Sequence, residues 1–348
     1  MRTSVAWQST DGSTAMERVR IQRRELRPDD LAVRVDYCGV CHSDLHAIHR
    51  TAHGTVVPGH EFTGTVTERG SAVTRFAVGD RVAVGTIVGS CGQCAMCRIG
   101  QENYCEQFPT LTYGGRDPVD SEPTLGGYSR EYVLPEGFAY PLPDGLDPAA
   151  AAPLLCAGIT VWEPLRATGI GPGSRVAVAG LGGLGHLAVK LAVALGAEVT
   201  VLSRTADKAE DARALGASTL LLSTDPEAMA GARGGFDLIL DTISAPHDVP
   251  ALLPLLGLDG TLSLLGFFGE ITVPVMALMM GRKKLSSSGT GGRAHTAELL
   301  AFCAEHGITA DIELVPSAQV VSALERLERG EVRYRFVLDL ADLDEPRA

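Results

Sequence analysis

Four cysteines lie close together in the first third of the chain, at Cys91, Cys94, Cys97 and Cys105. Four thiolates with the spacing C-x2-C-x2-C-x7-C can enclose a tetrahedral Zn²⁺ and leave no position open for a substrate. A bacterial ferredoxin run begins similarly, but its fourth Cys follows after three residues, whereas seven intervene here. Disulfides are disfavoured in a reducing compartment. The spacing favours a structural zinc site that fixes a loop and performs no chemistry.

A second set of metal-ligating residues is spread over three segments that contain Cys41, His60 and Cys156. A catalytic zinc takes three protein ligands and keeps a fourth position for water or substrate, and two thiolates with one imidazole form such a set. Each residue also has an ordinary interpretation. Cys156 could be a small buried side chain and His60 a loop histidine. Cys38 competes with Cys41 as a ligand, although its position at the end of an apolar strand favours the core.

Four polar residues near these candidates could assist a catalytic metal. Asp44 could accept a hydrogen bond from the second ring nitrogen of a ligating histidine, and Glu61 also fits a position around the metal. Ser43 and His46 could carry a proton from a buried site to water, because a hydroxyl followed by an imidazole can relay it. Each could equally be a solvated side chain of the loop or surface.

A glycine-rich turn, Gly180-Leu181-Gly182-Gly183-Leu184-Gly185, follows an expected strand and precedes an expected helix. In a βαβ context this pattern predicts a dinucleotide site whose pyrophosphate lies at the helix N-terminus. The second strand ends in Ser203-Arg204-Thr205, with Lys208 one turn later, where an NAD site would have an acid. A carboxylate repels a 2′-phosphate, whereas an arginine and hydroxyls bind it. We therefore expect NADP(H), the alternative being a plain polar turn with Arg204 in solvent.

The elements that must position these residues fall into two patterns. The first third reads as short strands separated by turns and by two long connections, 38–60 and 85–127, whose Cys and His content favours function. From Ser174 onward, strands alternate with helices over about 130 residues, which predicts a doubly wound parallel sheet. The expected strands are Ser4–Trp7, Val19–Ile21, Leu31–Tyr37, Phe62–Glu68, Asp80–Val84, 175–179, 198–202, Thr219–Leu222, Phe236–Asp241, Gly260–Gly266 and Arg335–Leu340. The expected helices run from the glycine turn to about Gly196 and over Ala206–Leu215, Thr296–His306 and Ser317–Arg329.

Length and composition narrow the function classes. A chain of 348 residues suggests about two domains, and 45% hydrophobic with 21% charged residues is an ordinary globular composition. The net charge of −12 argues against nucleic acid as a partner. No apolar run has the length of a membrane span, and the N-terminus lacks an apolar signal core. We expect a soluble, cytoplasmic protein, and we expect its eight cysteines to bind metal before they form disulfides.

With both cysteine sets and the glycine turn identified, the chain resembles the zinc-containing medium-chain alcohol dehydrogenases. It is most similar to their cinnamyl-alcohol-dehydrogenase-like, NADP-dependent branch. The resemblance extends almost from end to end. It rests on the Cys quartet, the Gly180 turn and the segments Cys38–His46, Pro58–Glu61, Thr124–Ser129, Leu155–Thr160 and Val332–Val337.

The resemblance implies an α/β protein with a GroES-like, mostly β catalytic domain from both chain ends and an inserted Rossmann domain. We expect residues 1–156 and 289–348 to form the former and 157–288 the latter. It implies two zinc ions per chain. Cys41, His60 and Cys156 would hold the catalytic one and the Cys quartet the structural one, with Glu61 able to enter the catalytic shell.

The resemblance further implies that Ser43 and His46 form the proton relay and that Thr160 lies beside the nicotinamide. His42 and Arg335 would lie near the pyrophosphate. Relatives of this branch are usually homodimers joined through their Rossmann sheets, and the apolar stretch Leu262–Met280 suits such an interface.

The expected reaction is reversible, NADP(H)-dependent reduction of an aldehyde to a primary alcohol. Plant cinnamyl enzymes have an aromatic residue where this chain reads Ser288-Gly289-Thr290-Gly291, and losing that ring removes a stacking surface. A cinnamyl substrate is therefore not implied, and another bulky or aliphatic aldehyde fits as well.

Three alternatives to this function remain. They are a zinc-free quinone or enoyl reductase, a reductase of imines or conjugated alkenes on the same scaffold, and a zinc- and NADPH-binding protein without turnover.

Overall fold

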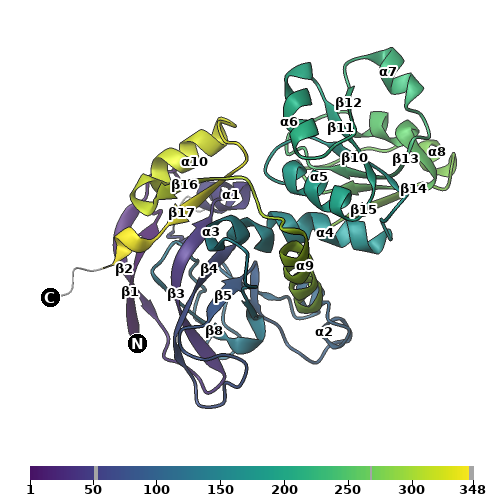
Figure 1. The fold of residues 1–348 in the computed structure, drawn as a ribbon. Coiled ribbons are helices and arrows are strands. Elements are labelled where there is room, and N and C mark those ends of the chain that lie inside the picture. Colours follow the sequence, from purple (N-terminus) through teal and green to yellow (C-terminus); the bar gives the residue numbers. More distant parts are fainter. Residues whose placement is uncertain (51–53, 267–268, 345–348) are drawn as a thin grey trace. The chain divides into compact units, whose positions relative to one another are not determined.

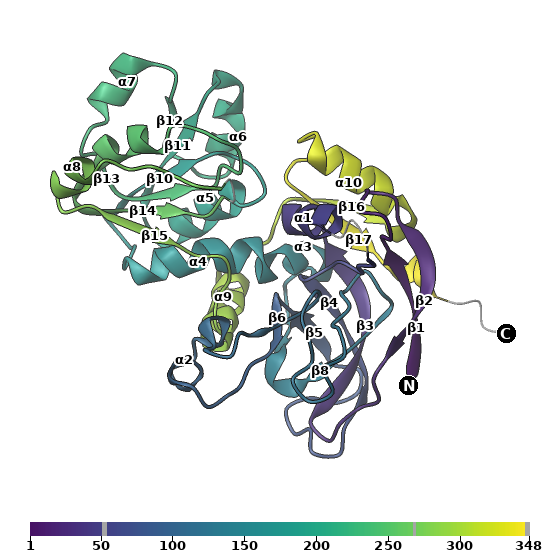
Figure 2. The ribbon, with the colours of Figure 1, turned by 180° about the vertical axis from the view of Figure 1, so that it is seen from behind.

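The computed structural model describes residues 1–50, 54–266 and 269–344. The chain divides into two compact units (Figures 1 and 2). Unit 1 contains Met1–Cys156 and Gly292–Ala348, and unit 2 contains Ala157–Gly291. The second boundary thus lies between residues 291 and 292, where the sequence suggested 288 and 289. Both chain ends therefore build one unit, and the middle of the chain builds the other.

Unit 1 is built on β-sheets. Within its described residues, the largest sheet has the order β16-β17-β3-β4-β5-β9, and β8 pairs with β3. These strands are β3 (Asp30–Gly39), β4 (Phe62–Arg69), β5 (Arg81–Val84), β8 (Glu131–Pro135), β9 (Ala139–Pro141), β16 (Ile312–Pro316) and β17 (Arg335–Asp339). Two smaller ladders pair β1 (Arg2–Gln8) with β2 (Glu17–Arg23) and β6 (Ile87–Gly89) with β7 (Thr110–Leu111).

Short helices connect and cover these strands. The α-helices of unit 1 are α1 (His42–Arg50), α2 (Ala95–Arg98), α3 (Pro148–Ala151), α9 (Arg293–His306) and α10 (Val320–Glu328). Single 3₁₀ turns are η1 (Glu102–Tyr104), η2 (Glu136–Phe138), η3 (Ala152–Leu155), η6 (Ser317–Gln319) and η7 (Ala341–Leu343). The apolar residues of α1, Leu45 and Ile48, are buried in the core of the unit. This short helix was not expected within the 38–60 connection, whose residues 51–53 lie outside the described part.

The pairing of β3 with β4 brings two expected metal ligands together. The strands run antiparallel with Cys38 opposite Phe62, and the Gly39 N–H donates to the Glu61 carbonyl at 2.8 Å. Cys41 follows the end of β3 and His60 precedes the start of β4. Because antiparallel partners meet where one strand ends and the other begins, residues 19 positions apart in sequence share one end of the sheet.

Unit 2 has the expected doubly wound arrangement. Its six strands are all parallel in the order β12-β11-β10-β13-β14-β15. They are β10 (Arg175–Ala179), β11 (Glu198–Ser203), β12 (Thr219–Leu222), β13 (Phe236–Asp241), β14 (Leu256–Leu264) and β15 (Lys284–Ser287). The helices are α4 (Ala157–Ala167), α5 (Gly185–Ala194), α6 (Ala209–Ala214), α7 (Pro226–Gly231), α8 (Val275–Met279) and the 3₁₀ turns η4 (Ala206–Lys208) and η5 (Val249–Leu255).

The order of these strands creates a topological switch. The chain passes from β10 outward to β11 and β12, then returns to β13 on the other side of β10. Ligands of open parallel sheets bind at the carboxyl ends of the strands at such a point. The glycine turn follows β10 and therefore stands at the switch. Among the described residues, no helix is both long and apolar enough to span a membrane.

Candidate functional site: two metal-ligand clusters and a nucleotide turn

Cys41, His60 and Cys156 converge in unit 1. The Cys41 Sγ lies 3.9 Å from the Cys156 Sγ, and the His60 Nε2 lies 3.2 Å from the same Cys156 sulfur. One ligand atom from each residue lies within 4.8 Å of the others, and all three side chains are buried. Cys156 reaches this point because it ends the 3₁₀ turn η3, where its N–H donates to the Pro153 carbonyl at 3.3 Å.

The spacing of these donor atoms fits zinc. Zn–S bonds of about 2.3 Å and Zn–N bonds of about 2.0 Å at tetrahedral angles put two sulfurs about 3.8 Å apart, and sulfur and nitrogen about 3.5 Å apart. The contact with the Cys156 sulfur lowers the pKa of the Cys41 thiol well below its usual range, and the Arg335 and His60 charges act in the same direction. Cys41 is therefore ready to bind a cation as a thiolate.

Asp44 organises this cluster from α1. Its side chain is fully buried and its Oδ1 is 3.1 Å from the His60 Nδ1. The Cys41 N–H donates to Oδ2 at 2.9 Å, the Gly59 N–H donates to Oδ1 at 3.1 Å, and the Tyr128 hydroxyl donates to Oδ2 at 3.2 Å. Because the carboxylate accepts from Nδ1, the His60 Nε2 is left as the ligand atom.

Two tyrosines that the sequence analysis did not select complete the surroundings of His60. Tyr128 binds Asp44 as described, and its backbone N–H donates to the Pro58 carbonyl at 2.9 Å. The Tyr113 ring lies 5.6 Å from the His60 ring, centroid to centroid, at a tilt of 53°. Neither could be found from spacing, because both come from the 85–127 connection and its continuation. The Gly-Gly-Tyr-Ser run that contains Tyr128 was the available signal.

Glu61 and Arg335 form a buried ion pair next to these ligands, with Arg335 Nη2 donating to Glu61 Oε1. Burial raises the pKa of Glu61 to about 7, although the Arg335 charge lowers it. The Glu61 Oε2 is buried and has no hydrogen-bond partner within the described residues. Glu61 is not in the three-residue ligand group, and the Arg335 guanidinium, expected at the pyrophosphate, is only 4% exposed against Glu61.

Cys38, the competing ligand, points elsewhere. Its thiol is fully buried in the core, its Sγ donates to the Gly39 carbonyl at 3.6 Å, and burial raises its pKa well above the usual range. A Cβ on Gly59 would lie 2.9 Å from this sulfur. Cys38 therefore packs behind the loop that carries His60, as its position at the end of an apolar strand suggested.

The Cys quartet is also assembled as its spacing predicted. Cys91, Cys94, Cys97 and Cys105 have sulfur atoms within 4.8 Å of one another. The backbone N–H groups of Cys94, Cys97 and Cys91 donate to the sulfurs of Cys91, Cys94 and Cys105, each at 3.4 Å. Donation from the Cys97 N–H lowers the pKa of Cys94 to about 6. Three of the four sulfurs thus accept a backbone N–H, and the four sulfurs together suit a closed tetrahedral zinc site.

The loop of the Cys quartet is attached to α9. Glu102, which is 2% exposed, accepts from the Arg293 N–H at 2.9 Å and from the Arg293 Nε at 2.7 Å. The carboxylate thus caps the first turn of α9, where Gly292 offers no side-chain cap. A zinc ion in this loop would stabilise a contact between two distant parts of the chain.

The glycine turn of unit 2 fits a pyrophosphate. Gly180 has φ +87°, and a Cβ on Gly185 would lie 2.0 Å from the Gly180 carbonyl oxygen, so both positions require glycine. A Cβ on Gly182 would meet nothing within 4 Å, so the backbone is open to a ligand there. Leu184, at the N-cap of α5, cannot accept a hydrogen bond with its side chain, and the first N–H groups of the helix can bind an anion.

The end of β11 offers a cationic and hydroxyl-bearing turn. Ser203 is half-buried, Arg204 and Thr205 are exposed, and Lys208 is half-buried. Within the described part of the chain, the Arg204 guanidinium has no ion-pair partner, while its carbonyl accepts from the Thr224 hydroxyl at 3.2 Å. The Thr205 hydroxyl donates to the nearby Asp207 carboxylate. The turn therefore presents one unpaired arginine where an NAD site would have an acid.

The other predicted site residues lie in α1 and α4. Ser43 and His46 are exposed on α1 three residues apart, so they share a face of the helix, and the Cys41 Sγ lies 3.6 Å from the Ser43 hydroxyl. His42 is exposed at the start of α1. Thr160 lies in α4 of unit 2, 5% exposed, and its hydroxyl donates to the Gly289 carbonyl at 3.0 Å.

Comparison with known proteins gives the family. Residues 27–144 match the alcohol dehydrogenase GroES-like domain, and residues 183–305 match the zinc-binding dehydrogenase domain. An NADP-dependent alcohol dehydrogenase C from Mycobacterium bovis is 45% identical over 99% of this chain and 100% of its own. The chain belongs to the zinc-binding alcohol dehydrogenase family. A probable formaldehyde dehydrogenase of Bacillus subtilis is 46% identical over 94% of this alcohol dehydrogenase and 95% of its own chain.

Solved structures agree with this membership. A cinnamyl alcohol dehydrogenase from Sorghum bicolor superimposes on this alcohol dehydrogenase with a TM-score of 0.95 at 40% identity, covering 99% of this chain and 100% of that one. A cinnamyl alcohol dehydrogenase from Helicobacter pylori, solved with NADP(H), gives 0.89 at 33% identity over 97% and 98% of the two chains. The expected GroES-like and Rossmann architecture and the cinnamyl-alcohol-dehydrogenase-like resemblance are confirmed.

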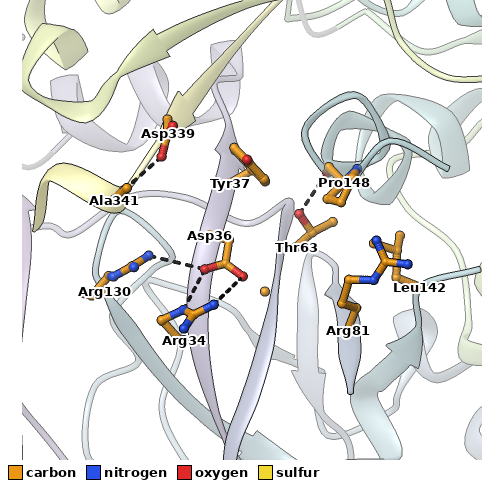
Figure 3. A pocket seen from close by; sticks show the side chains of 11 residues that line it. Arg34, Asp36, Tyr37, Thr63, Arg81, Arg130, Leu142, Pro148, Asp339 and Ala341 are labelled. Carbon is orange, nitrogen blue, oxygen red and sulfur yellow. Dashed lines mark hydrogen bonds and ion pairs between the residues drawn. The ribbon is translucent and has the colours of Figure 1, made fainter. Parts of the chain in front are cut away.

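One pocket of about 440 Å³ in unit 1 of this alcohol dehydrogenase is not lined by any of the metal ligands (Figure 3). The three arginines that line it pair with acidic side chains. Arg34 Nε donates to Asp36 Oδ1 at 2.8 Å, Arg130 Nη1 reaches the same oxygen at 3.4 Å, and Arg81 pairs with Asp144 at 3.2 Å. All three arginines of the pocket lining therefore already have acidic partners.

Proposed function

We propose that the chain is a zinc-dependent, NADP(H)-dependent alcohol dehydrogenase that reversibly reduces an aldehyde to a primary alcohol. The observation that carries this is the buried Cys41–His60–Cys156 cluster, whose donor spacing fits a three-ligand zinc site. The Cys quartet would hold a second, structural zinc. A zinc ion with three protein ligands supplies Lewis-acid polarisation of a carbonyl or alcohol oxygen.

The residues around the cluster have assigned tasks in this proposal. Asp44 fixes the tautomer and orientation of His60 by accepting from Nδ1. Ser43, beside Cys41, accepts the proton released from an alcohol hydroxyl, and His46 on the same helix face passes it to water. Glu61 is the further carboxylate available at this metal, and Arg335 neutralises it.

Most of the proposed cofactor contacts come from unit 2. The Gly180–Gly185 turn and the start of α5 bind the pyrophosphate, and the further candidate contacts of the cofactor are Thr160, His42 and Arg335. Ser203, Arg204, Thr205 and Lys208 bind the 2′-phosphate through charge-assisted hydrogen bonds. Nicotinamide supplies the hydride acceptor or donor when bound. The unpaired Arg204 and the absence of an acid at position 203 support NADP(H) over NAD(H).

The direct test combines metal analysis with an aldehyde panel. We expect about two zinc ions per chain and aldehyde-dependent oxidation of NADPH, measured at 340 nm with cinnamyl, benzylic and aliphatic aldehydes. Full zinc occupancy without turnover on any carbonyl would favour a binding protein. Turnover restricted to imines or conjugated alkenes would favour the alternative reductase. Turnover that persists after complete loss of zinc would contradict the proposed mechanism.

We further propose a homodimer formed through unit 2. In the stretch Leu262–Met280, whose residues 267–268 lie outside the described part, Val275, Met276 and Met279 of α8 are each at least 60% exposed. The neighbouring strand β15 is at the end of the six-stranded sheet. Exposed apolar patches beside a strand edge are typical of association surfaces.

Met276→Asp should shift the dimer toward monomer, because a charge in an apolar interface is costly to desolvate. Light scattering during gel filtration measures the mass. Val119→Asp, at a 73% exposed valine of unit 1, is the matched control and should remain dimeric. A wild-type monomer, or a Met276→Asp dimer as tight as the wild type, would contradict this interface.

The unpaired cysteines suggest a reducing compartment, so we place the enzyme in the cytoplasm, which cell fractionation tests.

A further inference from the structure

The loop that follows β13, residues 242–248, lies beside the glycine turn in unit 2. β10 and β13 are neighbours at the topological switch, so the loops after them flank the same crevice. The Thr242 N–H donates to the Ala179 carbonyl at 3.0 Å, and its hydroxyl is 2.9 Å from that oxygen and 3.1 Å from the Gly180 carbonyl. The path of this loop therefore limits where the glycine turn can lie.

The packing between the loop and its neighbours leaves little freedom. A Cβ on Gly180 would lie 3.1 Å from side-chain atoms of both Thr242 and Ile243. A Cβ on Gly266, after β14, would lie 1.9 Å from the Ile243 carbonyl oxygen. The backbone at residues 242–243 is thus enclosed on two sides. A small displacement of this loop would be transmitted to the turn that is proposed to bind the pyrophosphate.

An Asp–His pair closes the loop on itself. Asp241, the last residue of β13, is fully buried, and its Oδ2 lies 2.8 Å from the Nε2 of His247, which is 18% exposed. The other carboxylate oxygen, Oδ1, accepts from the Ile243 N–H at 3.2 Å. The His247 Nδ1 lies 2.8 Å from the Ala245 carbonyl. Both ring nitrogens therefore face oxygen atoms at hydrogen-bond distance.

These contacts require one shared proton between the two side chains. A carbonyl oxygen can only accept, so the His247 Nδ1 must donate to Ala245. Nε2 then either donates to the Asp241 carboxylate as part of an imidazolium or accepts from a protonated Asp241. Both arrangements contain the same number of protons. The pair is held together by a strong hydrogen bond whose acidic member is withdrawn from water.

We propose that Asp241 and His247 are positioning residues that hold loop 242–248 against the glycine turn and thereby set the affinity for NADP(H). Neither side chain needs to touch the cofactor. The inference rests on the proposed dinucleotide site and adds to it a pair of residues that no glycine or phosphate-binding pattern indicates. It assigns a function to a polar pair that the reaction itself does not use.

His247→Ala tests the pair. We expect NADPH to bind about ten-fold more weakly in a fluorescence titration, because a hydrogen bond to a charged group is lost from the loop that orders the site. With saturating NADPH, kcat should stay within about twofold of the wild type, since the metal ligands lie in unit 1. Hydrogen–deuterium exchange in the cofactor-free protein should be faster at residues 242–248. An unchanged Kd and unchanged exchange would overturn the proposal.

Asp241→Asn is the matched control. An asparagine can accept from the Ile243 N–H with Oδ1 and donate from Nδ2 to a neutral His247, so every hydrogen bond is kept without the charge. Its NADPH affinity should fall clearly less than that of His247→Ala, because the hydrogen bonds are kept and only their charge assistance is lost.

Should His247→Ala fail to fold, His247→Gln, which retains one donor toward Asp241, is measured instead and should give an intermediate loss. Wild-type protein that binds no NADPH would refute the proposed function, whereas normal wild-type binding with an unaffected His247 variant would refute only this inference.

Discussion

Replacing Cys156 with serine should abolish aldehyde reduction while the protein still folds and binds NADPH. A serine hydroxyl has nearly the shape of the thiol but is a poor zinc ligand at neutral pH, so the cluster would keep only Cys41 and His60. Zinc polarisation is worth several kcal/mol of barrier, and each 1.36 kcal/mol is tenfold in rate. The activity should therefore fall by at least about 1,000-fold. Zinc analysis should fall from about two ions per chain to about one.

Two other buried cysteines provide controls for this variant. Cys303 is fully buried in α9 and belongs to neither ligand group of the described residues, so Cys303→Ser should keep both zinc ions and activity. Cys38→Ala tests the competing ligand directly and should also keep both ions. Loss of zinc in Cys38→Ala, or full zinc and activity in Cys156→Ser, would overturn the assignment of the metal ligands. Loss of folding in Cys156→Ser alone would mean that the residue serves the core.

The two metal clusters differ in how far the sequence could predict them. The Cys quartet lies in one loop, so its ligand spacing is a local property and can be read directly. The other cluster joins Cys156 to Cys41 over 115 positions and to His60 over 96. No spacing rule covers such separations, and each residue taken singly also had an ordinary interpretation. Resemblance to a family supported this set, and the β3–β4 register explains why two of its three residues, Cys41 and His60, lie together.

Secondary structure, too, was predicted correctly where the local sequence marks it and missed where it depends on tertiary contacts. Buried parallel strands such as β10 and β13 have the expected bounds, because apolar runs mark them. Strand β15 was missed since all four of its residues are exposed and its sequence, Lys-Leu-Ser-Ser, has no apolar pattern. Helix α1 was missed because only Leu45 and Ile48 supply its apolar face. The predicted helix Ser317–Arg329 begins instead as η6, with α10 covering Val320–Glu328.

The contacts made by individual site residues also depend on tertiary structure. Arg335 pairs with Glu61 inside unit 1, which the sequence did not indicate, and its expected place near the pyrophosphate stays a prediction. An isolated arginine in a sequence gives no indication of which anion it will pair with. Tyr113 lies in a long connection, where no pattern distinguishes a tyrosine at a metal site from an ordinary aromatic residue. Tyr128 belongs to a recognised Gly-Gly-Tyr-Ser run, but the run alone gives the tyrosine no role.

Arg204→Ala should weaken the binding of NADPH by about 10- to 100-fold and leave the binding of NADH within about twofold. Only NADPH carries the 2′-phosphate, and a charge-assisted hydrogen bond to it is worth about 1.5–3 kcal/mol. Arg204 is exposed at the end of β11 and has no ion-pair partner within the described residues, so removing it should cost little stability. Titrations with both cofactors and the ratio of their kcat/KM values measure the effect.

Arg213→Ala is the matched control for this change. Arg213 lies near the end of α6, outside the β11 turn, and is exposed like Arg204, so its replacement alters the net charge of the unit by the same amount. It should leave the preference between the cofactors unchanged. A second variant, Ser203→Asp, introduces the acid that an NAD site has at this strand end; it should repel the 2′-phosphate and bind a ribose 2′-hydroxyl. If Arg204→Ala weakens both cofactors equally, the arginine contacts a part that they share, and the assignment of the 2′-phosphate to this turn fails.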